Sequence, residues 1–139
     1  IIPFRRDAVV MVISKSEKET YVTRILNGVD NIYSDVTEAK GGSGKYFRPH
    51  DLIAAGYASC LNITTRMVLD SMNLTYDEVT VKVELDRSHE GKTIFKYHID
   101  IQGQMDEEIK QTVLSKVMNC PVKQTLSKPM EFVHVDDLK

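Results

Sequence analysis

The two cysteines, Cys60 and Cys120, are the residues of this chain best suited to chemistry, and each has a distinctive sequence context. Cys60 ends an apolar, helix-like run that begins at Leu52. Cys120 directly precedes Pro121 at the junction before an expected short helix. Because cysteines in cytosolic proteins seldom form permanent crosslinks, this pair indicates thiol redox chemistry more than a structural disulfide.

Cys60 taken alone also fits a structural role, since free cysteines are often buried and pack as small hydrophobic groups. Its helical neighbours at three and four residues carry no charge: Gly56, Tyr57, Ile63 and Thr64. A reactive Cys60 would therefore need a cation from another element to favour its thiolate.

Cys120 is expected to be the N-cap of a helix that starts at Pro121, where the helix dipole would favour a thiolate. The alternative is a small residue packed at a corner between helices. The sequence does not show that the two cysteines meet. It permits a meeting, because the expected helices must bury their apolar faces in one small core.

The histidines are scattered without ligand spacing, so we expect no metal site. A Cys–His pair of an acyl-transfer enzyme is a further alternative. His98 should lie on the polar face of its strand, whereas His134 shares a face with Met130 and Phe132 and could be a core histidine.

The composition fits one domain over residues 1–139, with 42% hydrophobic and 27% charged residues. The net charge of −2 gives no reason to expect nucleic acid or a membrane surface as partner. No signal peptide or membrane-spanning run is expected, so cytoplasm is the expected compartment. Met11 could be the natural start, with residues 1–10 upstream of it.

The first half of the chain predicts strands over 9–14, 21–26 and 31–35, with Asn27-Gly28 as a tight turn. Residues 40–45 should form a flexible, glycine-rich loop that lacks the residues of a phosphate loop. A helix should then run from about His50 to Met72, and apolar residues on more than one face of its first half predict burial.

The second half predicts an antiparallel hairpin over 79–85 and 95–101, because apolar and polar residues alternate there. A helix should follow from Asp106, then a short helix over 121–126 and a closing strand over 130–135. This order of elements predicts an α+β protein.

Two motifs carry a family resemblance. Residues 48–60 read Arg-Pro-His-Asp-Leu-Ile-Ala-Ala-Gly-Tyr-Ala-Ser-Cys, and residues 119–126 read Asn-Cys-Pro-Val-Lys-Gln-Thr-Leu. In sequence, separation and element order they resemble the two cysteine motifs of the OsmC/Ohr family, the osmotically inducible and organic hydroperoxide resistance proteins. The resemblance extends from about Tyr21 to Val135.

The resemblance implies an intertwined α+β homodimer, with long central helices wrapped by antiparallel sheets. It implies a thiol peroxidase in which Cys60 attacks the peroxide and Cys120 resolves the sulfenic acid into a disulfide. A dithiol such as a protein-bound lipoyl group would reduce that disulfide. No metal or organic cofactor is implied.

The sequence departs from the family where the thiol is activated. Peroxidase members have a glutamate after the helix-opening proline, paired with an arginine that faces the reactive thiol. Here His50 takes that position, and the following Asp51 could approximate the glutamate from another helical angle.

Arg24 is the expected activating arginine, because it shares a strand face with Val22 and Leu26 and would point toward apolar surface. The alternative is an edge-strand arginine that extends to solvent. Arg66 is expected to be a surface or dimer-rim charge, and it and Arg48 are the next candidates, from a partner chain.

Three functions fit these residues. The first is a cysteine-based peroxidase that reduces organic hydroperoxides. The second is a non-catalytic OsmC-like protein that binds a small apolar molecule beside an unreactive Cys60. The third is a thiol acyl-transfer or hydrolytic enzyme. The reactivity of Cys60 toward peroxides separates the first from the second, and an acyl-enzyme would indicate the third.

Overall fold

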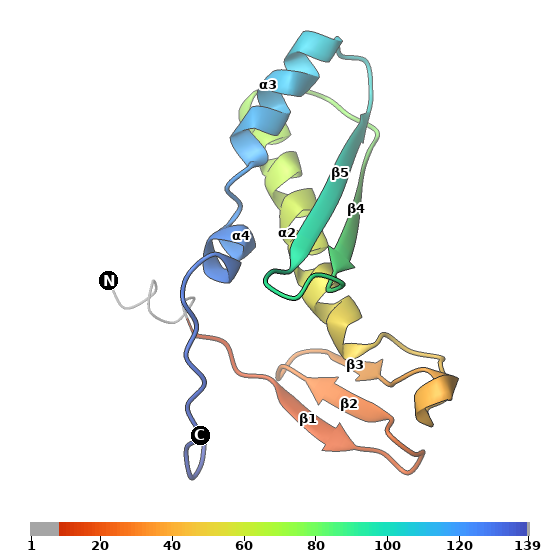
Figure 1. The fold of residues 1–139 in the computed structure, drawn as a ribbon. Coiled ribbons are helices and arrows are strands. Elements are labelled where there is room, and N and C mark those ends of the chain that lie inside the picture. The colour runs from red at the N-terminus through yellow and green to blue at the C-terminus, as the bar shows by residue number, and fades with distance from the viewer. Residues whose placement is uncertain (1–8, 139) are drawn as a thin grey trace. The chain divides into compact units, whose positions relative to one another are not determined.

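A computed structural model describes residues 9–138 of the chain, which form two compact units that divide between Ile53 and Ala54. Helices and antiparallel strands together confirm the α+β class (Figure 1). Most of the segment proposed to precede Met11 lies outside the described residues. The expectation of one domain over residues 1–139 stays a prediction.

The first unit holds a three-stranded antiparallel sheet in the order β1-β2-β3. Its strands are β1 (Ile13–Ser16), β2 (Thr23–Leu26) and β3 (Asn31–Ser34). The predicted strand over 9–14 was therefore placed too early, and residues 9–12 are exposed and outside the sheet. The physical reason is the short partner: β2 has four residues and pairs only with Ile13 through Ser16.

The turn between β2 and β3 confirms the Asn27-Gly28 prediction. The side-chain carbonyl of Asn27 accepts hydrogen bonds from the backbone N–H groups of Val29 at 2.9 Å and Asp30 at 2.8 Å. Gly28 has φ of +91°, a conformation that glycine adopts without a steric penalty. This local chemistry fixes the register of β2 on β3.

The glycine-rich loop after β3 is held by hydrogen bonds at Ser43, and its flexibility stays a prediction. Asp35 is only 2% exposed, and its carboxylate accepts hydrogen bonds from the backbone N–H and the hydroxyl of Ser43. These hydrogen bonds hold the pKa of Asp35 below its usual value. Gly42 packs so closely that a Cβ there would lie 2.6 Å from the Asp35 Oδ1 atom. A short 3-10 turn, η1 (Glu38–Lys40), lies within this loop.

Helix α2 (Pro49–Ser71), whose bounds match the predicted helix, begins in the first unit, and its part from Ala54 onward is the centre of the second unit. The helix buries one stripe of residues, spaced four apart: Tyr57, Leu61, Thr65 and Leu69. That stripe belongs to a core shared with the hairpin of β4 (Glu78–Asp86) and β5 (Ile94–Gln102) and with the helix α3 (Glu107–Val117) (Figure 1). Val79, Ile101, Val113 and Val117 are its buried members from these elements.

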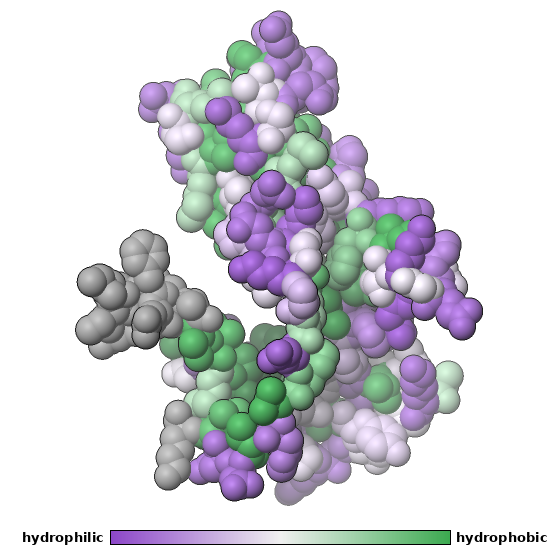
Figure 2. Space-filling view, turned by 60° about the vertical axis from the view of Figure 1, so that its left-hand side comes forward, coloured by the Kyte–Doolittle hydropathy of each residue, from purple (hydrophilic) through white to green (hydrophobic). Residues whose placement is uncertain are grey.

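Several other apolar residues of α2 are exposed in the single chain. In the first half of the helix, where burial on more than one face was predicted, Ile53 is 44% exposed, so that burial is not found. Further along, Ile63 is 42% exposed and Met67 is 65% exposed. Figure 2 shows apolar side chains among polar ones on one face of the molecule. By length and composition α2 could also cross a membrane, contrary to the expectation from sequence, but core helices of soluble proteins meet the same criteria.

The last elements follow local sequence signals closely. The Asp106 carboxylate caps α3 by accepting a hydrogen bond from the backbone N–H of Ile109 at 2.9 Å. The helix α4 (Pro121–Leu126) begins at its proline, as predicted.

The predicted closing strand over 130–135 is wrong, because no strand of the described chain pairs with it. Phe132 is 93% exposed and His134 is also exposed. The interpretation of His134 as a core histidine is therefore wrong as well. Alternation of apolar residues predicts a strand but does not supply the neighbouring edge that a strand needs.

Candidate functional site

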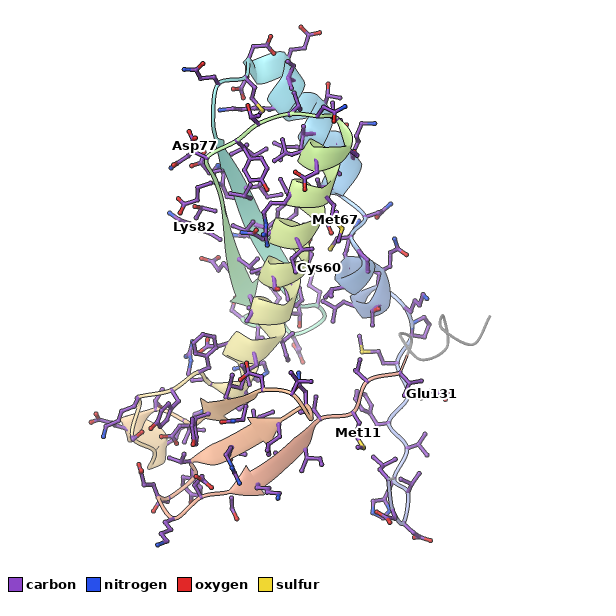
Figure 3. The ribbon with its side chains drawn as sticks, turned by 180° about the vertical axis from the view of Figure 1, so that it is seen from behind. Met11, Cys60, Met67, Asp77, Lys82 and Glu131 are labelled. Atoms are coloured by element: carbon purple, nitrogen blue, oxygen red, sulfur yellow. The ribbon has the colours of Figure 1, made fainter. Side chains whose placement is uncertain are left out.

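The two cysteines lie together in the second unit. Cys60 projects from α2 on the side where α4 lies, and the backbone N–H of Val122 donates a hydrogen bond to its Sγ atom at 3.5 Å (Figure 3). Cys120 is the residue that precedes α4 and belongs to the same core cluster. Helix α4 thus brings its N-terminal turn, and with it the second thiol, onto the first.

Burial distinguishes the two thiols. Cys60 is half-buried, whereas Cys120 is only 1% exposed. Burial raises the pKa of the Cys120 thiol, the backbone N–H of Lys123 partly opposes that rise, and the neighbouring Cys60 adds to it. The N-cap position of Cys120 is therefore confirmed, but the expected preference for a thiolate there is outweighed by desolvation.

A cluster of three aromatic side chains lies beside the cysteine pair, with Tyr57 nearest to the thiols. Tyr57 lies one helical turn before Cys60 and is 4% exposed. Its ring meets Phe95 at 5.6 Å and Tyr97 at 5.8 Å between ring centroids, both in edge-to-face geometry. Burial raises the pKa of Tyr57, with further contributions from Tyr97 and from both cysteines, so its phenol stays protonated at neutral pH.

The polar contacts of Cys60 within the second unit are few. They are the Cys120 thiol, the Val122 amide and the Thr64 hydroxyl, which lies 4.0 Å from the Sγ atom. The α2 residues three and four positions from Cys60 carry no charge. The sequence prediction missed the Val122 amide, whose sequence signal is the proline that starts α4 directly after Cys120.

Arg24, the predicted activating arginine, lies on β2 of the first unit, opposite Lys15 and Tyr33 in the sheet. Its Nε atom is 4.0 Å from the Glu17 carboxylate. That nitrogen is buried, and within the described part of the chain it has no hydrogen-bond partner. The structure does not place Arg24 relative to Cys60, so its role stays a prediction.

A carboxylate–arginine pair does exist at the start of α2, but it joins Asp51 to Arg48. The guanidinium of Arg48 donates to both carboxylate oxygens, at 2.9 and 3.1 Å, and the Arg48 backbone N–H donates at 2.9 Å. These bonds lower the pKa of Asp51 and raise that of Arg48. The spacing Arg-x-x-Asp around a helix-opening proline was the available signal for this pair. His50 is exposed.

The remaining candidate residues, Arg66 and His98, lie outside the contacts recorded for the two thiols. Arg66 donates to the Asn62 side-chain carbonyl at 2.8 Å, and the Asn62 amide donates to the backbone carbonyl of Val79 at 2.9 Å. The second of these bonds joins α2 to β4. His98 is exposed on β5, as predicted. The described residues contain no cluster of three or more metal-ligating side chains.

A cavity of about 550 Å³ lies between β5 and α3, away from the thiols. Its lining mixes apolar side chains, such as Ile99 and Leu114, with the charged side chains of Asp100, Glu107 and Lys110. Neither cysteine lines this cavity. It is the main alternative to the cysteine pair as a place for a small molecule.

Comparison with known proteins places the chain in a family. The family model described as OsmC-like protein matches residues 42–134. The OsmC-like protein of Mycoplasma pneumoniae has a similar structure, with a TM-score of 0.68 and 19% identity, over 85% of this chain and 86% of that one.

Two hydroperoxide resistance proteins share the fold. The organic hydroperoxide resistance protein of Elizabethkingia anophelis gives a TM-score of 0.62 at 23% identity, over 86% of this chain and 88% of that one. For OhrB of Bacillus subtilis the values are 0.57 and 22%, over 86% and 90%. No curated protein matches the sequence. The family model and the shared fold lead to one conclusion: the chain belongs to the OsmC-like family.

Proposed function

We propose that this protein is a thiol peroxidase that reduces organic hydroperoxides through Cys60 and Cys120. The observation that carries the proposal is the meeting of a half-buried and a fully buried thiol at the first turn of α4. Family membership supports it, as does the fold shared with proteins named for organic hydroperoxide resistance.

The proposed reaction has three steps. The Cys60 thiolate attacks one peroxide oxygen, the O–O bond breaks, and the alkoxide leaves as an alcohol after taking up a proton, so that Cys60 becomes a sulfenic acid. Cys120 then attacks the Cys60 sulfur, and water leaves as the disulfide forms. A dithiol, such as a protein-bound lipoyl group, exchanges with the disulfide and returns both thiols to the reduced state.

Arg24 is proposed to favour the Cys60 thiolate and to position the peroxide. A cation within about 4–6 Å stabilises a thiolate. The Nε atom of Arg24 is buried and has no hydrogen-bond partner among the described residues. This supports a role for the guanidinium in binding an anionic group, such as a thiolate, and not only in contacting solvent. Asp51 is already occupied by Arg48, so it is a poor substitute for the family glutamate.

The protein is further proposed to work as a homodimer in a reducing, cytoplasmic setting, where its thiols would be regenerated. The uncovered apolar face of α2 supports the dimer. No nucleic acid, membrane or metal takes part in the proposed reaction.

Stopped-flow measurement of peroxide consumption tests the function. With a dithiol reductant present, we expect cumene hydroperoxide to be consumed faster than hydrogen peroxide, and Cys60→Ser to abolish both reactions. Turnover that survives in Cys60→Ser would refute the mechanism, and so would a wild type that consumes neither peroxide.

The second candidate is a binding protein with an inert Cys60, and the cavity between β5 and α3 favours it. In that case peroxide would leave Cys60 unmodified, while an apolar ligand would protect the amides of α3 from hydrogen exchange. The third candidate, acyl transfer, would give a covalent Cys60 adduct with an activated ester, visible as a mass increase.

A further inference from the structure

The backbone N–H of Val122 is a hydrogen-bond donor to the reacting sulfur that the proposed mechanism does not use. It lies 3.5 Å from the Cys60 Sγ atom. Val122 follows Pro121 in the first turn of α4, where backbone N–H groups have no partner inside the helix. The first N–H to bond back is that of Gln124, to the Cys120 carbonyl at 3.1 Å. The Val122 donor thus has no partner within the helix and faces the cysteine pair, where it bonds the Cys60 sulfur and also acts on the Cys120 thiol.

A hydrogen bond to sulfur favours the thiolate over the thiol, because a charged acceptor binds a donor more strongly than a neutral one. Within the second unit the other polar groups near Sγ are the neutral Cys120 thiol and the Thr64 hydroxyl, the latter at 4.0 Å. The α2 residues one turn away on either side of Cys60 carry no charge. The Val122 amide is accordingly the backbone donor that contacts this sulfur, and it lies closer than the Thr64 hydroxyl.

We infer that the Val122 amide is a positioning group for the reactive sulfur: it stabilises the Cys60 thiolate and holds it toward Cys120. The donor and the buried second thiol belong to the same short segment, 120–122, so one turn sets both contacts. It is this single donor, and not the dipole of a six-residue helix, that acts. As a statement about peroxide reduction, the inference rests on the proposed function; as a statement about the thiolate, it does not.

The test removes the N–H and keeps the rest of the turn. Val122→Pro deletes the donor at a position where a helix tolerates proline, whereas Val122→Ala trims the side chain and keeps the donor. Because Pro121 would then precede a second proline, the turn could be strained. An amide-to-ester exchange at residue 122, with the valine side chain retained, therefore serves as the second variant. Circular dichroism confirms folding of each.

The first readout is the rate of Cys60 alkylation by iodoacetamide at neutral pH, with peptide mass spectrometry to separate it from Cys120. The second is thiolate absorbance near 240 nm. We expect Val122→Pro and the ester to alkylate about tenfold more slowly, as loss of a hydrogen bond to a charged group implies, with less thiolate absorbance. Val122→Ala should retain the wild-type rate.

Three results would overturn the inference: unchanged alkylation in both donor-free variants, equal slowing in Val122→Ala, or slowing without a change in thiolate absorbance. Peroxide consumption separates this inference from the proposed function. If alkylation depends on the amide but no variant consumes cumene hydroperoxide, the inference stands and the peroxidase proposal fails. If wild type and donor-free variants consume peroxide at one rate, the peroxidase proposal stands and the inference fails.

Discussion

Unequal burial of the two thiols gives each a different part in the proposed reaction. Cys60 is half-buried and can meet a peroxide from solvent, whereas Cys120 is 1% exposed and cannot be the first to react. The raised pKa of Cys120 also keeps it as a thiol at neutral pH, so in the proposed reaction it reacts only after Cys60 has become a sulfenic acid. The order of the two oxidation steps thus follows from desolvation.

Replacement of the second thiol should trap the first intermediate. Peroxide treatment of the wild type is expected to give an intrachain Cys60–Cys120 disulfide, seen as a loss of two mass units. Cys120→Ser should instead accumulate a sulfenic acid on Cys60 that oxidises further in excess peroxide. Mass spectrometry after dimedone labelling measures both species. If the treated wild type shows neither disulfide nor sulfenic acid, the mechanism is wrong.

Arg24→Met should slow peroxide reduction by about 100-fold, because it removes an electrostatic donor to the developing charge while keeping the length of the side chain. Arg87→Met, on the exposed segment after β4, is the matched control and should react at the wild-type rate. His50→Glu should change turnover less than Arg24→Met does. Second-order rate constants from stopped-flow traces measure the effect, and a wild-type rate in Arg24→Met would move the assignment to Arg48 or Arg66 of a partner chain.

At the scale of elements, sequence prediction succeeded where a local signal marks an end. Pro49 opens α2, Asp106 caps α3 and Pro121 opens α4, each at the predicted place. It failed where an end depends on a distant partner: β1 begins at Ile13 because β2 is short, and the segment 130–135 has no strand beside it. Both cysteine motifs were predicted, but not the Val122 amide, since a backbone donor leaves no side-chain signature.

The buried stripe of α2 should carry much of the stability of the second unit. Leu69 is 0% exposed, and Leu69→Ala should lower the free energy of unfolding by about 2–5 kcal/mol through lost burial and a cavity. Asp70→Ala, on the exposed side of the same turn, should change it by less than about 0.5 kcal/mol. Urea denaturation followed by circular dichroism compares them, and equal effects would contradict this packing.

The start of α2 should respond to acid. The folded state lowers the pKa of Asp51, so the stabilisation from its bonds to Arg48 is complete above the pKa of an unfolded aspartate. It is lost as pH falls through the folded-state pKa. Asp51→Asn should therefore be less stable than wild type at pH 7, by at most about 1 kcal/mol, and the difference should shrink toward pH 3. Thermal melts across this range measure it; a constant difference would exclude the linkage.

At the scale of the whole molecule, one chain leaves apolar surface uncovered in each unit. Met67 is 65% exposed on α2, and Val9 and Val10 are 76% and 84% exposed before β1. Contiguous exposed apolar surface marks an interaction site in soluble proteins. The family resemblance implies that a second copy of this chain covers the surface in a homodimer.

We expect a stable dimer in solution, with an interface of more than about 2,000 Å² of buried surface. Met67→Glu should shift it toward monomer, because a carboxylate would be buried without a partner. Lys82→Glu, on the exposed face of β4, is the control and should remain dimeric (Figure 3). Multi-angle light scattering at micromolar concentration measures the mass. A monomeric wild type would remove the dimer proposal.

The close packing of Gly42 against the backbone of Val36 and the side chain of Asp35 limits which residues position 42 can accept. A Cβ at residue 42 would collide first with the backbone carbonyl of Val36 and then with the Asp35 carboxylate. Because the backbone carbonyl is present whatever residue stands at 35, Gly42 should be retained even in related chains that lose Asp35 and Ser43. A glycine far from both thiols is thus expected to tolerate less change than its polar neighbours.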